Sequence, residues 1–367
     1  MAQACMRNIW ALGKEDTGKT ELLDNLALND IYKGKSIAYF GEGAEKLLRY
    51  IPPKHRGRTI LLDPSDIEFP IAFQPVTDAD GFRSTVKSFW HADIATINLD
   101  LYIAATIRAL AEEATILNIP RMLNSATYRK KIVGKLTNAS MREFWEEYDK
   151  IPAKERRGEI RSTLNRMWLL LTDDVIRNIV GQKTKLDLDD LKDKIIIVPL
   201  KRRPLTSEKL SFIGSLILST LYNAGFTGRY YLDNVHRLAP HLIKDMLDEK
   251  ASLVVTHHYL RQLHTELMDA LIGRVSTVYA FRLGVADAEV MRKQFSINDG
   301  NQSLDDALEL LRDHVAHVVT PSGVKPSQVM REISRSLYLA SPEKIRADSR
   351  LRYATPRAEV EARLNAS

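Results

Sequence analysis

The chain has 367 residues, 44% of them hydrophobic, which suits one large or two ordinary globular domains and excludes a disordered chain. Cys5 is the only cysteine, which excludes a disulfide framework and a thiolate metal site and favours a reducing compartment, the cytoplasm. The net charge of +6 favours nucleic acid or an acidic membrane surface as a partner, whereas the longest apolar stretch, residues 212–221, is too short to span a bilayer.

The first expected strand, residues 7–12, leads into a complete phosphate-binding pattern, G-x-x-x-x-G-K-[ST]. Glycines let backbone N–H groups face the phosphates, the lysine neutralises the β and γ oxygens, and the hydroxyl ligates Mg²⁺. A helix expected at residues 21–28 places its N-terminus beside the phosphates. The loop therefore predicts a nucleoside triphosphate site with Mg²⁺, formed by Gly13, Asp16, Thr17, Gly18, Lys19, Thr20 and Glu21.

Two acidic residues in this loop oppose phosphate binding. Glu15 and Asp16 place carboxylates beside the expected phosphates. Like charges weaken binding unless Lys14, Lys19 or Mg²⁺ compensates for them.

Short apolar runs rich in β-branched residues, each followed by a turn or by helical periodicity, predict an α/β fold with a mainly parallel sheet covered by helices. The runs are residues 36–40, 59–63, 194–198, 229–232, 252–256, 275–281 and 315–319. We expect residues 1–78 and 182–340 to form the two parts of this core and residues 79–181 to form a mostly helical insertion. The arginine-rich tail, residues 341–367, is expected on the surface or on a partner.

The strand at residues 229–232 ends in Asp233, where an ATPase of this architecture holds magnesium; a helix or turn cap is the alternative role. The next residue is Asn234 instead of the usual glutamate. An amide cannot take a proton from the attacking water, and losing a general base typically costs about 10²–10⁴ in rate. Glu42, after the strand at residues 36–40, is the candidate replacement base.

Two further strand ends carry residues that suit a triphosphate site. His258 follows the strand at residues 252–256 and is placed to sense the γ-phosphate. Arg282 follows the strand at residues 275–281 and suits an arginine finger that reaches a neighbouring subunit. A surface arginine in an ion pair is an equally open interpretation of Arg282.

The order of these motifs resembles the HerA/FtsK superfamily of ring-forming DNA-pumping ATPases, and within it the TraG/TraD-type coupling proteins of conjugation and their stand-alone relatives. The resemblance spans nearly the whole chain. Beyond the phosphate loop it includes L-D-P-S-D at 62–66, P-I-A-F-Q-P at 70–75, F-W at 144–145, G-S-L at 214–216, Y-L-D at 231–233, F-R-L-G at 281–284, D-A-E at 287–289, S-R-L-R-Y at 349–353 and E-V-E at 359–361.

The resemblance implies a RecA-like P-loop ATPase core that binds ATP on the loop and Mg²⁺ at Asp233, with Arg282 at a subunit boundary. It also implies a hexameric ring with DNA in its channel. The chain begins almost at the first motor strand, so we expect no membrane insertion. Four departures weaken the expectation of hydrolysis more than that of binding: Asp16 replaces a glycine, Asn234 a glutamate, His258 a glutamine, and F-G-E-G at 40–43 an Asp-Pro-x-Gly type sequence.

Lys201, Arg202 and Arg203 are the candidate DNA surface, because they follow the strand at residues 194–198 and parallel sheets bind ligands at the carboxyl ends of their strands. Such contacts to phosphates would be independent of sequence; a solvated basic turn is the alternative.

The sequence thus favours two functions. One is an ATP-driven DNA translocase acting in transfer, packaging or processing. The other is a nucleotide-binding ring scaffold with weak or no hydrolysis, acting with an active subunit, a nuclease or a secretion or packaging component. A third function, a small-molecule kinase, lacks a recognisable acceptor site and lid.

Overall fold

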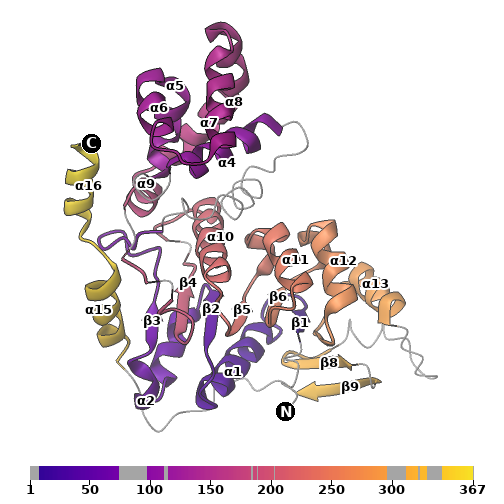
Figure 1. Cartoon of the computed structure of the whole chain (residues 1–367). Helices are drawn as coiled ribbons and strands as arrows, with labels where there is room; N and C mark the ends of the chain where they lie inside the picture. Colours follow the sequence, from indigo (N-terminus) through magenta and orange to yellow (C-terminus); the bar gives the residue numbers. More distant parts are fainter. Residues whose placement is uncertain are drawn as a thin grey trace. The chain divides into compact units, whose positions relative to one another are not determined.

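The structure, a computed structural model, describes residues 8–73, 97–110, 115–182, 185–187, 189–201, 203–295, 311–320, 323–328 and 341–366 (Figure 1). The chain forms two compact units. Unit 1 comprises Met1–Ser65, Leu188–Leu210 and Gly225–Ser349, and unit 2 comprises Asp66–Asp187, Ser211–Ala224 and Arg350–Ser367.

Unit 1 is built on a sheet whose nine described strands lie in the order β3-β4-β2-β5-β6-β1-β7-β8-β9. Neighbouring strands from β3 to β7 run parallel, and all residues of β2 and β4 are buried, as expected for a sheet covered on both faces. The strands are β1 (Ile9–Leu12), β2 (Ile37–Gly41), β3 (Thr59–Leu61), β4 (Ile195–Pro199), β5 (Arg229–Leu232), β6 (Leu253–His257), β7 (Thr277–Ala280), β8 (Val315–Thr320) and β9 (Gly323–Gln328).

Every strand expected from the sequence is present, and the predicted α/β fold with a mainly parallel sheet is confirmed. The edge of the sheet formed by β8 and β9 differs from the prediction. Strand β8 pairs antiparallel with β7 and with β9, and β9 was not predicted. Alternation or apolar content along a strand identifies the strand but not its direction, which depends on its neighbours.

The helices of unit 1 pack their apolar side chains on this sheet. In α1, Leu23, Ala27 and Ile31 belong to one buried cluster with Ile197 of β4 and Val254 of β6. The described helices are α1 (Lys19–Tyr32), η1 (Ala44–Tyr50), α2 (Pro53–Arg56), η6 (Val235–Arg237), α11 (Pro240–Asp248), η7 (Leu260–Gln262), α12 (Thr265–Arg274), α13 (Val285–Phe295) and the first part of α15 (Pro342–Tyr353). Helix α10 (Ser207–Asn223) begins in this unit and continues in unit 2.

Unit 2 is mostly helical over its described residues, with one isolated β-bridge between Ile71 and Ala354. Arg129 is fully buried, donates to the Met122 carbonyl at 2.7 Å and lies 4.8 Å above the Tyr148 ring, while Trp145 packs edge-on against Tyr148. Its helices are α4 (Ile97–Leu110), η5 (Ile116–Asn118), α5 (Ile119–Asn124), α6 (Ala126–Val133), α7 (Ala139–Lys150), α8 (Ala153–Leu171), α9 (Asp174–Val180), the rest of α10, the end of α15 and α16 (Arg357–Asn365). Among all the described helices, none combines the length and apolar character that a membrane span requires.

The C-terminal segment divides between the two units, unlike the separate tail expected at residues 341–367. In unit 1, Ile345 is 4% exposed and the Ser349 hydroxyl accepts the Leu61 N–H at 3.0 Å. In unit 2, Tyr353 and Val360 are buried, and both Arg350 guanidinium contacts to Asp66 are hydrogen bonds of 2.7–2.9 Å. The sequence analysis placed this segment on the surface because most of its residues are charged. Its few apolar residues that become buried are widely spaced and form no clear periodic pattern.

Candidate nucleotide-binding site

Five neighbouring strands of unit 1 deliver the predicted site residues to one edge of the sheet. The strand order β2-β5-β6-β1-β7 places the ends of these strands side by side. Their parallel registers align Phe40 with Leu232, and Leu12 with both His257 and Ala280. The residues that follow these strands are therefore neighbours at the carboxyl edge, where parallel sheets bind ligands: Glu42, Asp233, Asn234, His258, Gly13 and Arg282.

The phosphate loop has the backbone geometry that its glycines predicted. Gly13 has φ 155° and Gly18 has φ 110°, both in the region that side chains disfavour. A Cβ on Gly13 would lie 2.5 Å from Cβ of Phe281, and a Cβ on Gly18 would lie 3.1 Å from Cα of His314. Neighbouring segments hold the loop, since the Lys14 N–H donates to the Arg282 carbonyl at 2.9 Å and the His314 N–H to the Thr17 carbonyl at 2.8 Å.

Asp16 replaces a loop glycine at a position that needs a left-handed backbone. Its φ is 56°, which asparagine and aspartate adopt more readily than other side chains. Glu15 and Asp16 are both exposed, and Glu15 Oε1 lies 3.8 Å from His258 Nε2. Their carboxylates therefore have water available, which reduces the repulsion that the sequence predicted.

Lys19 is the first residue of α1 and is 5% exposed. Its ammonium donates to the Lys14 carbonyl at 2.5 Å, inside the loop. Burial lowers the pKa of Lys19 to about 8, although nearby Asp233 and Glu15 act in the opposite direction. A buried ammonium inside this loop is suited to a multiply charged phosphate.

Asp233 lies at the end of β5 with its side chain buried. The Thr256 hydroxyl of β6 donates to its Oδ1 at 2.6 Å. Burial raises the pKa of Asp233, against the hydrogen bond from Thr256 and the charge on Lys19. Gly41 leaves room for this carboxylate, because a Cβ there would lie 3.0 Å from Asp233 Cβ.

The residues present fit Mg²⁺. The Asp233 carboxylate and the Thr20 hydroxyl are hard oxygen ligands, and Mg²⁺ characteristically takes one or two protein ligands together with phosphates and water. Over the described part of the chain, no group of three or more His, Cys, Asp and Glu side chains forms a cage for a metal. Such a site depends on the bound phosphates for its remaining ligands.

Asn234 has a left-handed backbone, with φ 56° and ψ 55°. Its N–H donates to the Thr256 hydroxyl at 3.0 Å, so Thr256 orients both Asp233 and Asn234. The side-chain oxygen of Asn234 is buried and has no hydrogen-bond partner among the described atoms. The position is thus at the site, but its amide cannot act as a base.

The other candidate catalytic residues lie at the same edge in different settings. Glu42 is about half exposed and its Oε2 lies 3.9 Å from Nη1 of Arg237. The His258 N–H donates to Gln262 Oε1 at 2.9 Å, and burial, with the charge on Lys19, lowers the pKa of His258. Arg282 pairs with Asp313 of the same chain at 3.0 Å.

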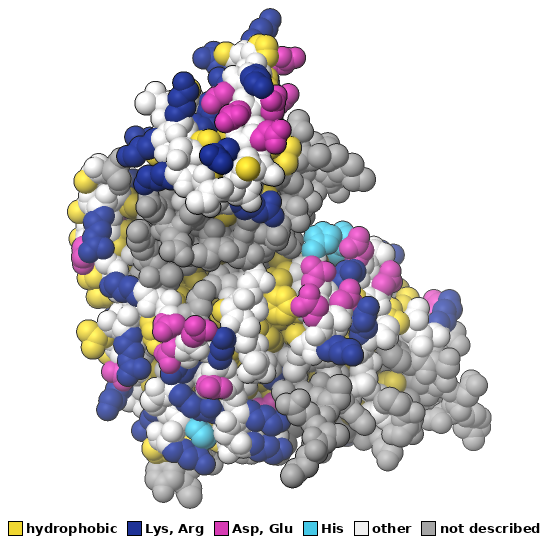
Figure 2. All heavy atoms as spheres, in the orientation of Figure 1, with side chains coloured by type: hydrophobic (Ala, Val, Ile, Leu, Met, Phe, Trp, Pro, Cys, Tyr) yellow, Lys and Arg dark blue, Asp and Glu magenta, His cyan; other side chains and the backbone are white. Residues whose placement is uncertain are grey.

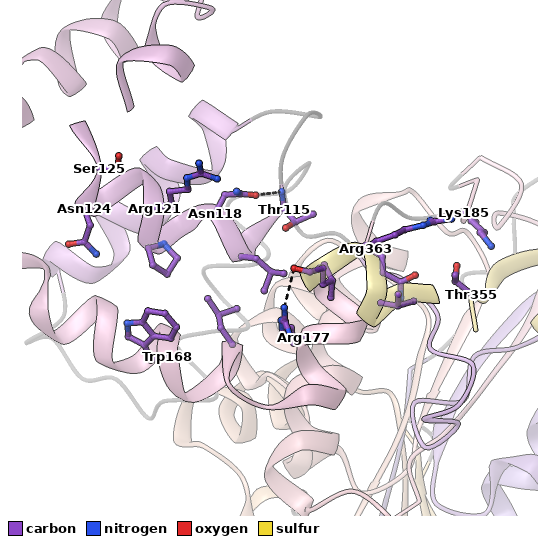
Figure 3. Close-up of a pocket in the computed structure, with 17 residues that line it drawn as sticks. Thr115, Asn118, Arg121, Asn124, Ser125, Trp168, Arg177, Lys185, Thr355 and Arg363 are labelled. Atoms are coloured by element: carbon purple, nitrogen blue, oxygen red, sulfur yellow. Dashed lines mark hydrogen bonds between the residues drawn. The ribbon is translucent and has the colours of Figure 1, made fainter. Parts of the chain in front are cut away.

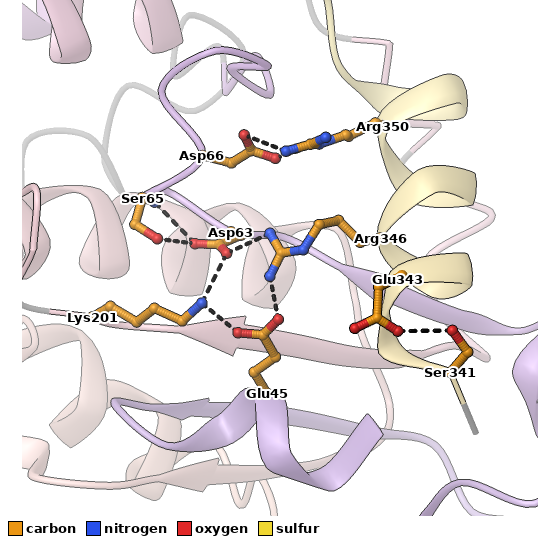
Figure 4. Close-up of polar contacts among 9 residues, drawn as sticks. All are labelled: Glu45, Asp63, Ser65, Asp66, Lys201, Ser341, Glu343, Arg346 and Arg350. Atoms are coloured by element: carbon orange, nitrogen blue, oxygen red, sulfur yellow. Dashed lines mark hydrogen bonds and ion pairs between the residues drawn. The ribbon is translucent and has the colours of Figure 1, made fainter. Parts of the chain in front are cut away.

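The structure places Lys201 in a cluster of opposite charges within unit 1 (Figure 4). Its ammonium pairs with Glu45 and lies 3.4 Å from Asp63, and Arg346 of α15 pairs with the same two carboxylates. Burial raises the pKa of Asp63, but the bonds from Ser65 and Arg346 and the charge on Lys201 outweigh it and lower that pKa.

These carboxylates neutralise Lys201 and weaken its predicted role in DNA binding. Arg203 is exposed, and Arg202 lies outside the described residues. On the face drawn in Figure 2, basic and acidic side chains are interspersed, so the positive net charge does not form one continuous basic surface there.

A hydrogen-bonded pair of Trp10 and His257, on β1 and β6, was not predicted. The Trp10 indole N–H donates to His257 Nε2 at 2.7 Å, and His257 Nδ1 lies 3.1 Å from the Tyr259 carbonyl. Nε2 is therefore the acceptor and Nδ1 carries the proton. Burial lowers the pKa of His257 to about 3, so the ring is a neutral structural link between β1 and β6. The only signal in the sequence was the position of His257 directly after an apolar strand expected at residues 252–256.

No family model matches the sequence, and no curated protein matches it either. Solved structures do match. Plasmid coupling protein TrwB in complex with the ATP analogue ADPNP has a TM-score of 0.64 at 14% identity, covering 90% of this chain and 87% of TrwB. TrwB with ADP and Mg²⁺ has a TM-score of 0.62 at 14% identity, covering 92% and 89%. VirB4 of Thermoanaerobacter pseudethanolicus has a TM-score of 0.60 at 14% identity, covering 89% of each chain.

At these identities the comparisons establish the fold. The RecA-like core expected from the resemblance to the HerA/FtsK superfamily is confirmed. The chain has the fold of the conjugative coupling protein TrwB and of VirB4, over about nine-tenths of its length.

Proposed function

We propose that this protein is an ATP-binding, ring-forming DNA translocase of the HerA/FtsK type, acting in the cytoplasm in DNA transfer, packaging or processing. The observation that carries the proposal is the meeting of a complete phosphate loop with Asp233, His258 and Arg282 at the ends of adjacent parallel strands. Structures of similar fold support the choice of nucleotide, because TrwB has been solved with ADPNP and with ADP and Mg²⁺.

Each residue of the site has a role in this proposal. The loop N–H groups and Lys19 bind the phosphates, while Thr20 and Asp233 hold Mg²⁺, which neutralises charge on the phosphates when bound. Thr256 fixes the orientation of Asp233. Glu42 accepts the proton of the attacking water, and Arg282 acts on the site of a neighbouring subunit in a hexamer after leaving Asp313.

A nucleotide-binding scaffold with weak or no hydrolysis is the second candidate function. Asn234 favours it, because the residue beside Asp233 cannot take a proton. Such a scaffold would act with an active ATPase subunit, a nuclease or a secretion or packaging component.

The deciding experiment is steady-state ATP hydrolysis by the purified protein with and without single- and double-stranded DNA. We expect DNA-stimulated turnover that Lys19→Ala abolishes, because the variant removes the buried phosphate-facing ammonium. We expect Glu42→Gln to lower the rate by about 10²–10⁴ while ATP binding is retained. The matched control is Glu208→Gln, an exposed carboxylate in the first turn of α10.

The outcomes separate the two functions. ATP binding that depends on Lys19, without turnover above the Lys19→Ala blank, would identify the scaffold. Full turnover in Glu42→Gln would remove Glu42 as the base. Six protomers in a ring, measured by mass in the presence of ATP and DNA, are expected for either function, and a monomer under those conditions would contradict both.

A further inference from the structure

Unit 2 contains a pocket of about 900 Å³ that the ATP site does not use. Helices α5, α8, α9 and α16 contribute to its walls, and all of its lining residues belong to this unit. The volume lies at the upper end of the range for ligand sites, about 300–1,000 Å³. A lone small anion would leave most of this space unfilled.

The lining of the pocket is positively charged. Among the 17 residues that line the pocket are four cations and no carboxylate. The cations are Arg121, Arg177, Lys185 and Arg363. The rest of the lining is apolar, small or neutral and polar. An anionic ligand is therefore favoured.

Neutral groups orient three of these cations, although the charge of one of them, Arg177, also acts on the Glu361 carboxylate of α16. Arg177 donates to the Leu364 carbonyl and to the Asn365 side-chain oxygen, and Lys185 donates to the Ala354 carbonyl at 2.8 Å. The Arg121 guanidinium lies 4.6 Å above the Tyr128 ring. Among the described residues, only the fourth cation, Arg363, pairs with a carboxylate, an exposed glutamate one turn earlier on α16.

An exposed aromatic ring completes the pocket. Trp168 of α8 is 53% exposed, which is high for a tryptophan in a helix that packs on others. Figure 3 shows Trp168 and Asn124 on one side of the pocket, Lys185 and Thr355 on the other, and Arg177 between them. The ring and the charges thus follow one another along the pocket.

We propose that this pocket binds a short unpaired stretch of nucleic acid, with a base stacked on Trp168 and phosphates on Arg121, Arg177 and Lys185. Sites for single strands combine a positive groove for the backbone with aromatic rings on which bases stack. A duplex does not satisfy this pocket, because paired bases have no free face for Trp168. An acidic peptide would match the cations but would gain little from the ring.

The site extends the proposed function and does not depend on it. The phosphate loop belongs to unit 1 and the pocket to unit 2. Binding to the pocket is expected without nucleotide and in the Lys19→Ala variant. Failure of ATP hydrolysis would therefore leave this proposal intact. Failure of the pocket to bind an oligonucleotide would likewise leave the proposed ATP site intact.

The test is the anisotropy of a fluorescein-labelled hexathymidylate titrated with the full chain in the absence of ATP. Loss of base stacking in Trp168→Ala is expected to weaken binding at least about fivefold, and Trp168→Phe is expected to restore most of it. Neutralising two phosphate contacts in Arg121→Gln with Lys185→Gln should reduce the slope of log K against log salt by about 1.4. Arg142→Gln, an exposed charge of α7 outside the pocket, is the matched control and should bind as the wild type does.

A six-nucleotide single strand that carries 5-iodouracil locates the contact. We expect its photocrosslink in the peptide that contains Trp168. Unchanged binding in Trp168→Ala, with the fold verified by thermal unfolding, would overturn the proposal. A crosslink confined to unit 1 would do the same. Hexaglutamate that displaces the oligonucleotide at an equal concentration would make the pocket a site for acidic peptides instead.

Discussion

At the scale of single residues, two departures from the pattern of the HerA/FtsK superfamily share one backbone feature. Asp16 and Asn234 both have φ 56°. Aspartate and asparagine tolerate this region, whereas a longer acidic side chain would be strained there by about 1–3 kcal/mol. The left-handed backbone at position 234 therefore favours asparagine over glutamate.

His257 gives the protein a specific dependence of stability on pH. Its pKa is about 3 in the folded protein and about 6.5 in the unfolded chain, so the unfolded state binds more protons between these values. Stability is fully present above pH 6.5 and is lost as the pH falls toward 3. Between pH 7.5 and pH 5 we expect this residue to contribute a loss of about 2 kcal/mol in the free energy of unfolding.

Urea unfolding of the wild type and of His257→Gln at the two pH values measures this contribution. The glutamine keeps an acceptor for the Trp10 indole but cannot be protonated, so its stability should change by about 2 kcal/mol less across the interval. Parallel pH profiles for the two proteins would show that His257 does not carry the effect.

At the scale of elements, two buried aspartates attach α1 to the sheet. The Tyr39 hydroxyl of β2 donates to Asp24 at 2.6 Å, and the Tyr231 hydroxyl of β5 donates to Asp30 at 2.7 Å. Lys46 pairs with Asp24 at 2.5 Å. These bonds set the position of the helix whose N-terminus carries Lys19 and Thr20.

Tyr39→Phe tests this attachment. It leaves the Asp24 carboxylate, whose side chain is fully buried, without one of its donors. We expect a loss of about 1–3 kcal/mol in the free energy of unfolding, measured with urea. A double-mutant cycle with Asp24→Ala, which removes the acceptor, provides the control, since a direct bond predicts a coupling of at least about 0.5 kcal/mol. Additive effects would mean that Tyr39 acts through packing alone.

At the scale of the whole molecule, each unit draws on chain segments that are far apart in the sequence. The last helices supply Ile345 and Ser349 to unit 1 and Tyr353 and Val360 to unit 2. Arg346 also pairs with Asp63, whose side chain is 4% exposed. The C-terminal segment is thus part of both units.

A chain that stops after residue 340 should lose most of its stability. Burial of Ile345, Tyr353 and Val360 contributes about 1.5–3 kcal/mol each, which together approaches the total stability of a typical domain. In calorimetry we expect a Tm lower by more than about 10 °C or no cooperative transition. The full chain with Lys344→Gln and Arg352→Gln, both exposed, is the charge control and should melt within a few degrees of the wild type. An unchanged Tm after truncation would mean that the segment adds no stability and is the surface tail that the sequence predicted.

The sequence by itself determined the phosphate loop, the strands and the α/β fold, because these depend on local patterns: glycine spacing and apolar runs bounded by turns. Tertiary structure decided the direction of β8, the pairing of Lys201 with Glu45 and Asp63, and the packing of the C-terminal helices. It also decided the pocket at Trp168, whose lining residues come from segments as far apart as Thr115 and Leu364. Partners distant in sequence leave no local periodicity, and the charge of a side chain does not reveal which opposite charge lies beside it.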